Sequence, residues 1–98
     1  MATFTETTFG ATGDGSVVRC SRCIVGVTGT FTATIAIKWI DKGGTEHTVQ
    51  DSGADLEFTA AGEKVLDFGV PVSVFAECTA YTSGSPKVCI QGATLTYP

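Results

Sequence analysis

The residues in this chain best suited to chemistry are its four cysteines. Cys20 and Cys23 have the C-x-x-C spacing of a zinc knuckle or of a redox-active pair. A zinc site needs a second close pair of ligands, but Cys78 and Cys89 fall in two separate predicted strands and His47 falls in a hairpin. A redox-active C-x-x-C sits at a helix N-terminus, whereas this one lies in a strand-like run. The spacing therefore favours neither a metal site nor redox catalysis.

The state of the thiols stays open between two further alternatives. Cys78 and Cys89 lie in strands joined by a tight turn over residues 81–86, so a disulfide can form between them if the strands pair in the right register. The other alternative is four free thiols, because cysteine packs in cores as a small apolar side chain. The N-terminus lacks the basic start and continuous apolar centre of a secretion signal, which favours the free thiols.

The remaining ionisable residues form no recognisable catalytic set. Glu46 and His47 are adjacent, so in a strand they point to opposite faces. Asp51, Asp55 and Glu57 flank loops with no nucleophile nearby, and their spacing matches no calcium-binding loop. We therefore predict no enzyme activity, no catalytic residue and no cofactor.

Aromatic residues are better candidates for contacts with other proteins. Trp39 falls on the apolar face of a regular strand, which predicts core packing rather than a sugar-binding platform. Tyr81 and Tyr97 lie at a turn and at the chain end, where amphipathic rings often serve interfaces. Together with Phe4 and Phe9 in the N-terminal segment, they are the predicted assembly contacts.

Composition narrows the class of protein. The chain has 98 residues, of which 43% are hydrophobic and 16% charged, and this length predicts one small domain. Its polar residues include 16 threonines, while charged residues are few. Threonine favours strands, because it is β-branched and still polar. A net charge of −4 argues against binding to nucleic acid, because the phosphate backbone attracts basic surfaces. No stretch is long and apolar enough to predict a membrane span.

Several segments alternate between apolar and polar residues, as half-buried strands do. The clearest is 31–40, followed by an Asp-Lys-Gly-Gly hairpin turn and a returning strand over 45–50. A β-branched run covers 16–28, and its pattern slips near Ser21, which predicts an irregularity there. Residues 72–81 alternate with Val74 and Ala80 on the apolar side and Phe75 and Tyr81 on the wetter side.

These segments predict an all-β fold. Seven or eight short strands with a turn signal after each are typical of a single antiparallel β-sandwich, either immunoglobulin-like or jelly-roll-like. Residues 16–98 form the predicted sandwich, and residues 1–15 form a Thr- and Gly-rich arm or edge strand. We expect the domain to fold without residues 1–12 and to need them for assembly.

Four segments occur in an order that resembles a known group of proteins. They are Gly29-Thr30-Phe31-Thr32-Ala33-Thr34-Ile35, Asp41-Lys42-Gly43-Gly44-Thr45, Phe58-Thr59-Ala60-Ala61-Gly62-Glu63 and Cys78-Thr79-Ala80-Tyr81-Thr82-Ser83-Gly84. Together they resemble the small β-sandwich virion proteins of tailed bacteriophages, over about residues 29–92. The chain departs from that pattern in its four cysteines and in Lys38-Trp39-Ile40 before the hairpin.

The resemblance implies a structural role on a virus particle. The expected function is capsid decoration, with the major capsid protein or other virion proteins as partners. It also implies a homo-oligomer located in the virion and made in the host cytoplasm, with no nucleic acid and no membrane among its partners. A minor head–tail or tail component is the alternative within the same class.

Two other classes compete with this expectation. A carbohydrate-binding or adhesion module is also an acidic β-sandwich, but it needs exposed aromatic rings aligned on one face. An extracellular immunoglobulin-like domain needs a disulfide between its sheets, packed against a tryptophan. Cys23, Trp39 and Cys78 have that order along the chain.

Overall fold

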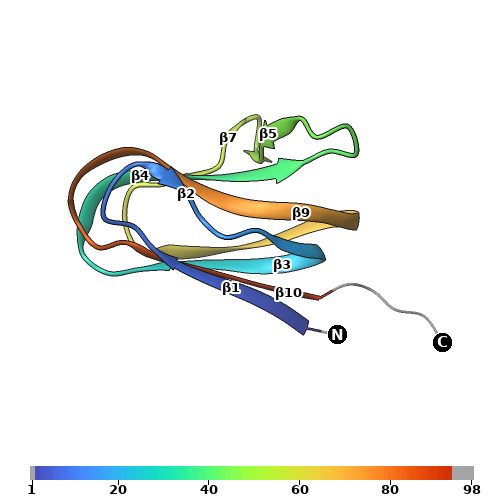
Figure 1. Ribbon diagram of the computed structural model, residues 1–98, viewed down its shortest axis with the longest axis horizontal. Helices are drawn as coiled ribbons and strands as arrows, with labels where there is room; N and C mark the ends of the chain where they lie inside the picture. Colours follow the sequence, from blue (N-terminus) through green and yellow to red (C-terminus); the bar gives the residue numbers. More distant parts are fainter. Residues whose placement is uncertain (1, 94–98) are drawn as a thin grey trace.

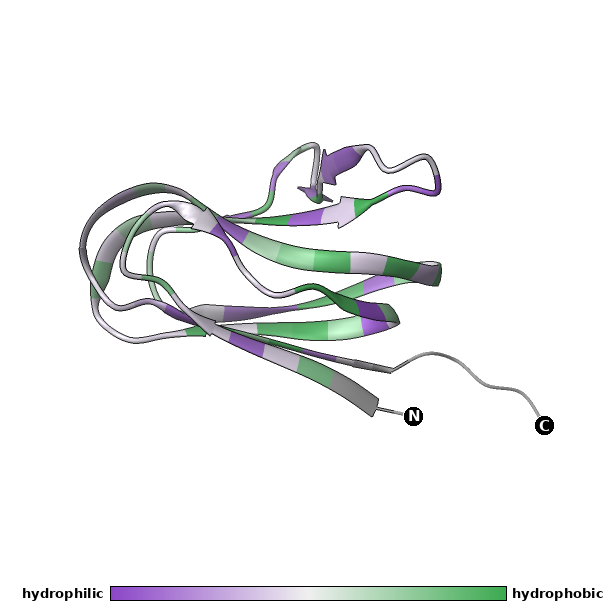
Figure 2. Cartoon of the chain, in the orientation of Figure 1, coloured by the Kyte–Doolittle hydropathy of each residue, from purple (hydrophilic) through white to green (hydrophobic). Residues whose placement is uncertain are grey.

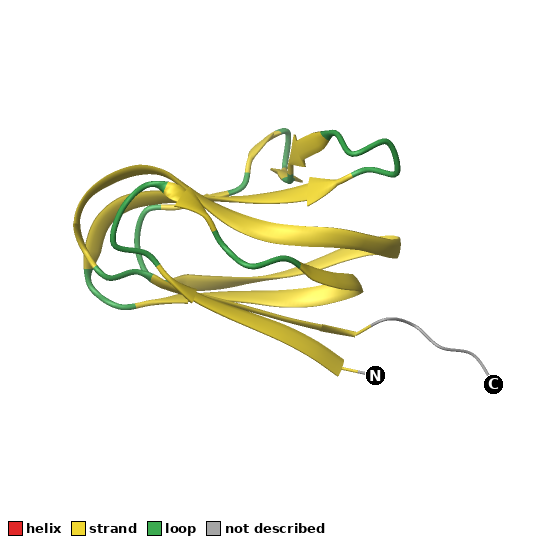
Figure 3. Cartoon of the chain, in the orientation of Figure 1, coloured by secondary structure: helices red, strands yellow, loops and turns green. Residues whose placement is uncertain are grey.

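The computed structural model describes residues 2–93, and this part of the chain consists of strands joined by loops and turns (Figure 3). The strands pair in antiparallel fashion, which confirms the predicted all-β, sandwich-like fold. The strands are β1 (Ala2–Thr8), β2 (Gly13–Asp14), β3 (Val18–Thr28), β4 (Phe31–Ile40), β5 (Glu46–Thr48), β6 (Gln50–Asp51), β7 (Ala54–Asp55), β8 (Glu57–Phe58), β9 (Gly62–Gly84) and β10 (Lys87–Ala93).

The main sheet folds over on itself to make two layers, which lie one above the other in Figure 1. The first, here called the β1 layer, contains β1, β10, residues 22–28 of β3 and residues 62–68 of β9, in that order. Residues 18–20 of β3 pair instead with residues 72–74 of β9. The second, the β4 layer, contains residues 72–84 of β9 with β4, β5, β8 and β2. The small β6–β7 hairpin lies beside the β4 layer.

The long strand β9 joins the two layers at a corner. Gly69-Val70-Pro71 contains two residues that usually interrupt strands, but β9 continues through them and bends. Gly69 adopts a φ of 78°, and its N–H donates to the Asp67 carboxylate at 3.0 Å. In β3 the register shifts between Cys20 and Arg22, which confirms the predicted irregularity at Ser21.

The core lies between the layers and is lined by the inward faces of β3, β4, β9 and β10. Figure 2 shows hydrophobic residues concentrated along β3, β4 and β9. The largest fully buried aliphatic side chains are Ile35, Ile37, Ile90, Val25, Val27, Val74 and Val88. Phe31 and Trp39 are partly buried and pack against this cluster, as the alternation of β4 predicts.

Two bulges in β9 change which residues face the core. Ile35 pairs with Cys78 but Thr34 pairs with Ala80, so Thr79 is an extra residue in β9. This shift moves Tyr81 onto the core side and leaves Ala80 exposed, the reverse of the prediction. Phe75 was also predicted on the wetter side, and it does face away from Val74, yet it is only 2% exposed.

The N-terminal segment is part of the folded domain. β1 pairs with β10 through seven residues, and the Phe9 N–H donates to the Pro86 carbonyl at 2.9 Å. Phe9 is 5% exposed and belongs to the core cluster. These contacts argue against the expectation that the domain folds without residues 1–12, because their removal takes away a strand and a core side chain.

Candidate functional site

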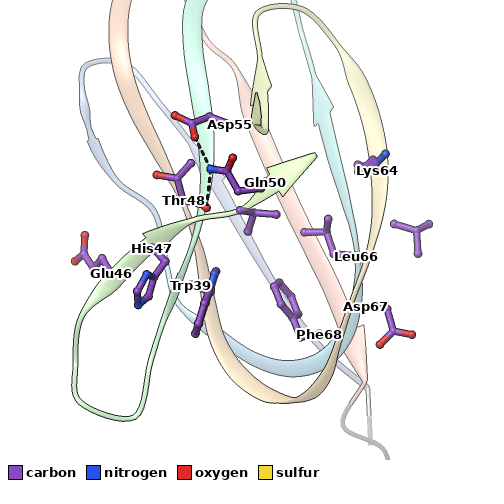
Figure 4. Close-up of a pocket in the computed structure, with 12 residues that line it drawn as sticks. Trp39, Glu46, His47, Thr48, Gln50, Asp55, Lys64, Leu66, Asp67 and Phe68 are labelled. Carbon is purple, nitrogen blue, oxygen red and sulfur yellow. Dashed lines mark hydrogen bonds between the residues drawn. The ribbon is translucent and has the colours of Figure 1, made fainter. Parts of the chain in front are cut away.

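A groove of about 970 Å³ opens between the edges of the two layers (Figure 4). One wall comes from β5, β6 and β7 with Trp39 of β4, and the other from residues 64–68 of β9. The Lys64 ammonium contacts the Asp51 carboxylate at 3.2 Å and so links the β1 layer to the β6–β7 hairpin. Gln50 donates to Asp55 along the same wall, as the dashed line in Figure 4 shows.

The rings of Trp39 and His47 in the groove contact other residues of the same chain. The rings of Trp39 and His47 stack with centroids 4.5 Å apart and an interplanar angle of 21°. His47 Nε2 lies 2.8 Å from Asp41 Oδ2. Asp41 Oδ1 accepts hydrogen bonds from the N–H groups of Gly43 and Thr45, at 2.9 and 3.0 Å.

These contacts favour the charged form of the Asp41 carboxyl. The hydrogen bond to His47, and then the backbone N–H of Thr45, lower the pKa of the Asp41 carboxyl, because both favour its charged form. The Asp41 carboxylate therefore organises the β4–β5 turn, and the role of His47 here is to hold that turn against Trp39.

The cysteines lie apart from one another, with the exception of Cys20 and Cys23. The bulge at Ser21 places both of these side chains in the core, although residues three apart in a regular strand face opposite sides. Gly92 makes room for them, since a Cβ at this position would lie 2.6 Å from the Cys20 Cβ.

Cys78 and Cys89 do not meet, so of the two alternatives for these residues the structure supports free thiols over a disulfide. Cys78 lies in the β4 layer and faces the core, whereas Cys89 lies in the β1 layer, on the face opposite to buried Val88 and Ile90. The connection after Gly84 crosses from one layer to the other and does not form a hairpin. All four cysteines are free, and this also excludes the Cys23–Cys78 bridge of an immunoglobulin-like domain in this structure.

Burial governs the reactivity of the core thiols. Burial, reinforced by the neighbouring Cys20, raises the pKa of Cys23 to about 12. Desolvation also raises the pKa of Cys20 and of Cys78. Because the thiolate is the reactive form, all three thiols are held in their unreactive state. Within residues 2–93, no three His, Cys, Asp or Glu side chains are grouped to hold a metal ion.

We expect alkylation to distinguish Cys89 from the other three cysteines. Cys89 is half-buried, while Cys20, Cys23 and Cys78 are buried. With iodoacetamide at pH 8 the folded protein should gain one adduct quickly, and the other three only after denaturant is added. Peptide mass mapping locates the first adduct. Rapid modification of Cys20 or Cys23 in the folded protein would contradict the assigned burial.

The outer face of the β1 layer carries a row of exposed apolar side chains. Phe4, Gln91, Ile24 and Val65 are successive cross-strand partners on β1, β10, β3 and β9. Phe4 is 67% exposed, Ile24 41% and Val65 53%. Because neighbouring strands are about 4.8 Å apart, the row spans about 15 Å. Phe4, Ile24 and Val65 are called the apolar row below.

Of the predicted assembly contacts that the structure describes, only Phe4 lies on this surface. Phe9 is buried in the core, so it offers no contact to another protein. Tyr81 packs against the core, and its hydroxyl donates to the Gly84 carbonyl at 2.6 Å. Tyr97 lies outside the described residues. Ile24 and Val65 were not identified from the sequence. Ile24 could have been found, because side chains alternate along a strand and its neighbours Cys23 and Val25 are buried.

No protein-family model, no curated protein and no solved structure matches this chain. A search of residues 2–93 for a helix long and apolar enough to cross a membrane found none.

Proposed function

We propose that this chain is a non-enzymatic structural protein of a tailed-phage virion, most simply a capsid decoration protein that binds the capsid shell. The observation that carries the proposal is the apolar row on the outer face of the β1 layer. Five large hydrophobic side chains are exposed in the described part of the chain, and three of them fall in this one row. Clustered exposed apolar side chains are typical of protein-binding surfaces, whereas scattered ones are ordinary.

The surroundings of the row support a protein partner. Ile24 lies between its two cross-strand partners, Gln91 of β10 and Val65 of β9. The next outward position along β3 is Gly26, which has no side chain. The outward positions on either side of the row carry exposed charges, Glu6 and Glu63 on one side and Arg22 and Asp67 on the other. The surface therefore has the apolar centre and polar rim that are typical of protein–protein interfaces. A minor head–tail or tail component would use the same surface on a different part of the particle.

The groove supports the carbohydrate-binding alternative less well. Sugar platforms need exposed rings, but the Trp39 ring packs against the core and stacks on His47. Among the described aromatic side chains, only Phe4 is exposed, and it lies on the apolar row rather than in the groove. One exposed ring does not make an aligned platform.

The proposal is tested by co-expressing the chain with the major capsid protein of the same genome and separating shells on a density gradient. Val65→Lys is compared with Val17→Lys, because these valines are 53% and 54% exposed and only Val65 lies on the row. We expect the wild type and Val17→Lys to sediment with the shells, and Val65→Lys to bind them with an about tenfold higher dissociation constant, equal to about 1.4 kcal/mol.

Thermal melting of both variants controls for changes in folding. Equal binding of Val65→Lys and Val17→Lys would show that the row does not contact the shell. Absence of the wild-type chain from the shell fraction would overturn the decoration function itself.

A further inference from the structure

The outer edge of β1 is an unprotected strand edge. Within residues 2–93, β10 is the only strand that pairs with β1, so the backbone groups along its other side have no strand partner. The strand contains no proline and shows no register shift against β10 over seven residues. A regular edge of this kind is a template for pairing with another chain.

The opposite edge of the same layer is protected in the way that natural edges usually are. Residues 62–68 of β9 form this edge and include Glu63, Lys64 and Asp67. The Lys64 side chain is held by Asp51 of β6, and the strand then bends away at Gly69. Charges and bends of this kind oppose edge pairing, whereas β1 shows no register shift and contains a single charged residue, Glu6.

The single charged residue of β1 does not oppose pairing with a second copy. The Glu6 carboxylate lies 3.3 Å from the Lys87 ammonium of the same chain, so two β1 strands can approach without meeting an unbalanced pair of negative charges. An antiparallel edge is also self-complementary under two-fold symmetry, which is the commonest symmetry of protein dimers.

We propose that two copies of this chain pair through β1 in antiparallel fashion, with Phe4 opposite Phe4 of the second copy. In this register, even-numbered residues stay opposite even-numbered ones, so the outer faces of both copies fall on one side of a continuous eight-stranded layer. The two apolar rows then join end to end at Phe4. This dimer forms from the chain alone and does not depend on the proposed binding to a capsid.

The test is the mass of the purified protein, measured by light scattering during size-exclusion chromatography over a range of concentrations. The wild type should approach twice its chain mass of 10.1 kDa as the concentration rises. Phe4→Lys should raise the dimer dissociation constant at least about tenfold, since it sets like charges opposite each other and removes an apolar pair. Val65→Lys is the matched control, because it changes the same face at the opposite end of the apolar row from β1.

The register is tested by mixing two variants. Phe4→Lys and Phe4→Glu should each be monomeric alone and should form a dimer when mixed, since opposite charges then face each other. A wild type that stays at 10.1 kDa at millimolar concentration would overturn the proposal. Equal loss of the dimer in Phe4→Lys and Val65→Lys would indicate face-to-face packing instead, and a mixture that stays monomeric would overturn the register.

Discussion

Phe9→Ala is expected to lower the free energy of unfolding by about 3–5 kcal/mol, the usual loss for truncating a buried phenylalanine. Phe9 is 5% exposed and packs in the core immediately after β1. Its backbone N–H also donates to the carbonyl of Pro86, the residue just before β10. Domains of this size are stable by only about 5–15 kcal/mol, so this one change removes a large share of the total.

Phe4→Ala is the matched control, since it truncates the same residue type in the same segment. Phe4 is 67% exposed, and we expect its loss to change stability by less than about 0.5 kcal/mol. Urea unfolding followed by circular dichroism measures both variants. Equal effects at the two positions would contradict the assignment of residues 2–9 as an integral part of the domain.

Gly84→Ala is expected to destabilise the domain by about 2–6 kcal/mol, as the sum of backbone strain and steric overlap. Gly84 ends β9 with a φ of 93°, a conformation that alanine adopts only with strain. A Cβ there would also overlap the Thr30 carbonyl oxygen and lie 2.5 Å from the Phe31 Cα. Both obstacles are backbone atoms, so neither can move aside as a flexible side chain would.

Two other glycines separate the contributions of strain and overlap. Gly69 has a φ of 78° and open space around its Cβ position, so Gly69→Ala should show the strain alone, about 1–3 kcal/mol. Gly26 has open space and no positive φ, so Gly26→Ala should be neutral or stabilising by up to about 1 kcal/mol. Thermal melts rank the three variants, and a Gly84→Ala variant as stable as Gly26→Ala would contradict the packing at this end of β9.

The sequence predicts those parts of the fold in which a local pattern determines the structure. The alternation over β4 identifies the core residues Ile35 and Ile37, and the slip at Ser21 reveals a bulge. The bulges near Thr79 and Thr82 leave no such signal, because threonine suits either face of a strand. The side assigned to Tyr81 was wrong for this reason.

The pairing of distant strands is what the sequence does not reveal. Ser83-Gly84-Ser85-Pro86 is a turn signal whether the chain returns beside β9 or crosses to the other layer, so the separation of Cys78 from Cys89 was not foreseen. The apolar row cannot be predicted from the sequence for the same reason. Phe4, Ile24 and Val65 are far apart along the chain and come together only through the register of three strand pairs.

The most direct test of the proposed function is whether the wild-type chain is present in purified virus particles. Quantitative mass spectrometry of gradient-purified particles measures its copy number relative to the major capsid protein. A decoration protein is expected at a fixed ratio to the capsid protein, and Val65→Lys should reduce that ratio while Val17→Lys should not. Particles that contain the capsid protein and lack this chain would contradict the proposal.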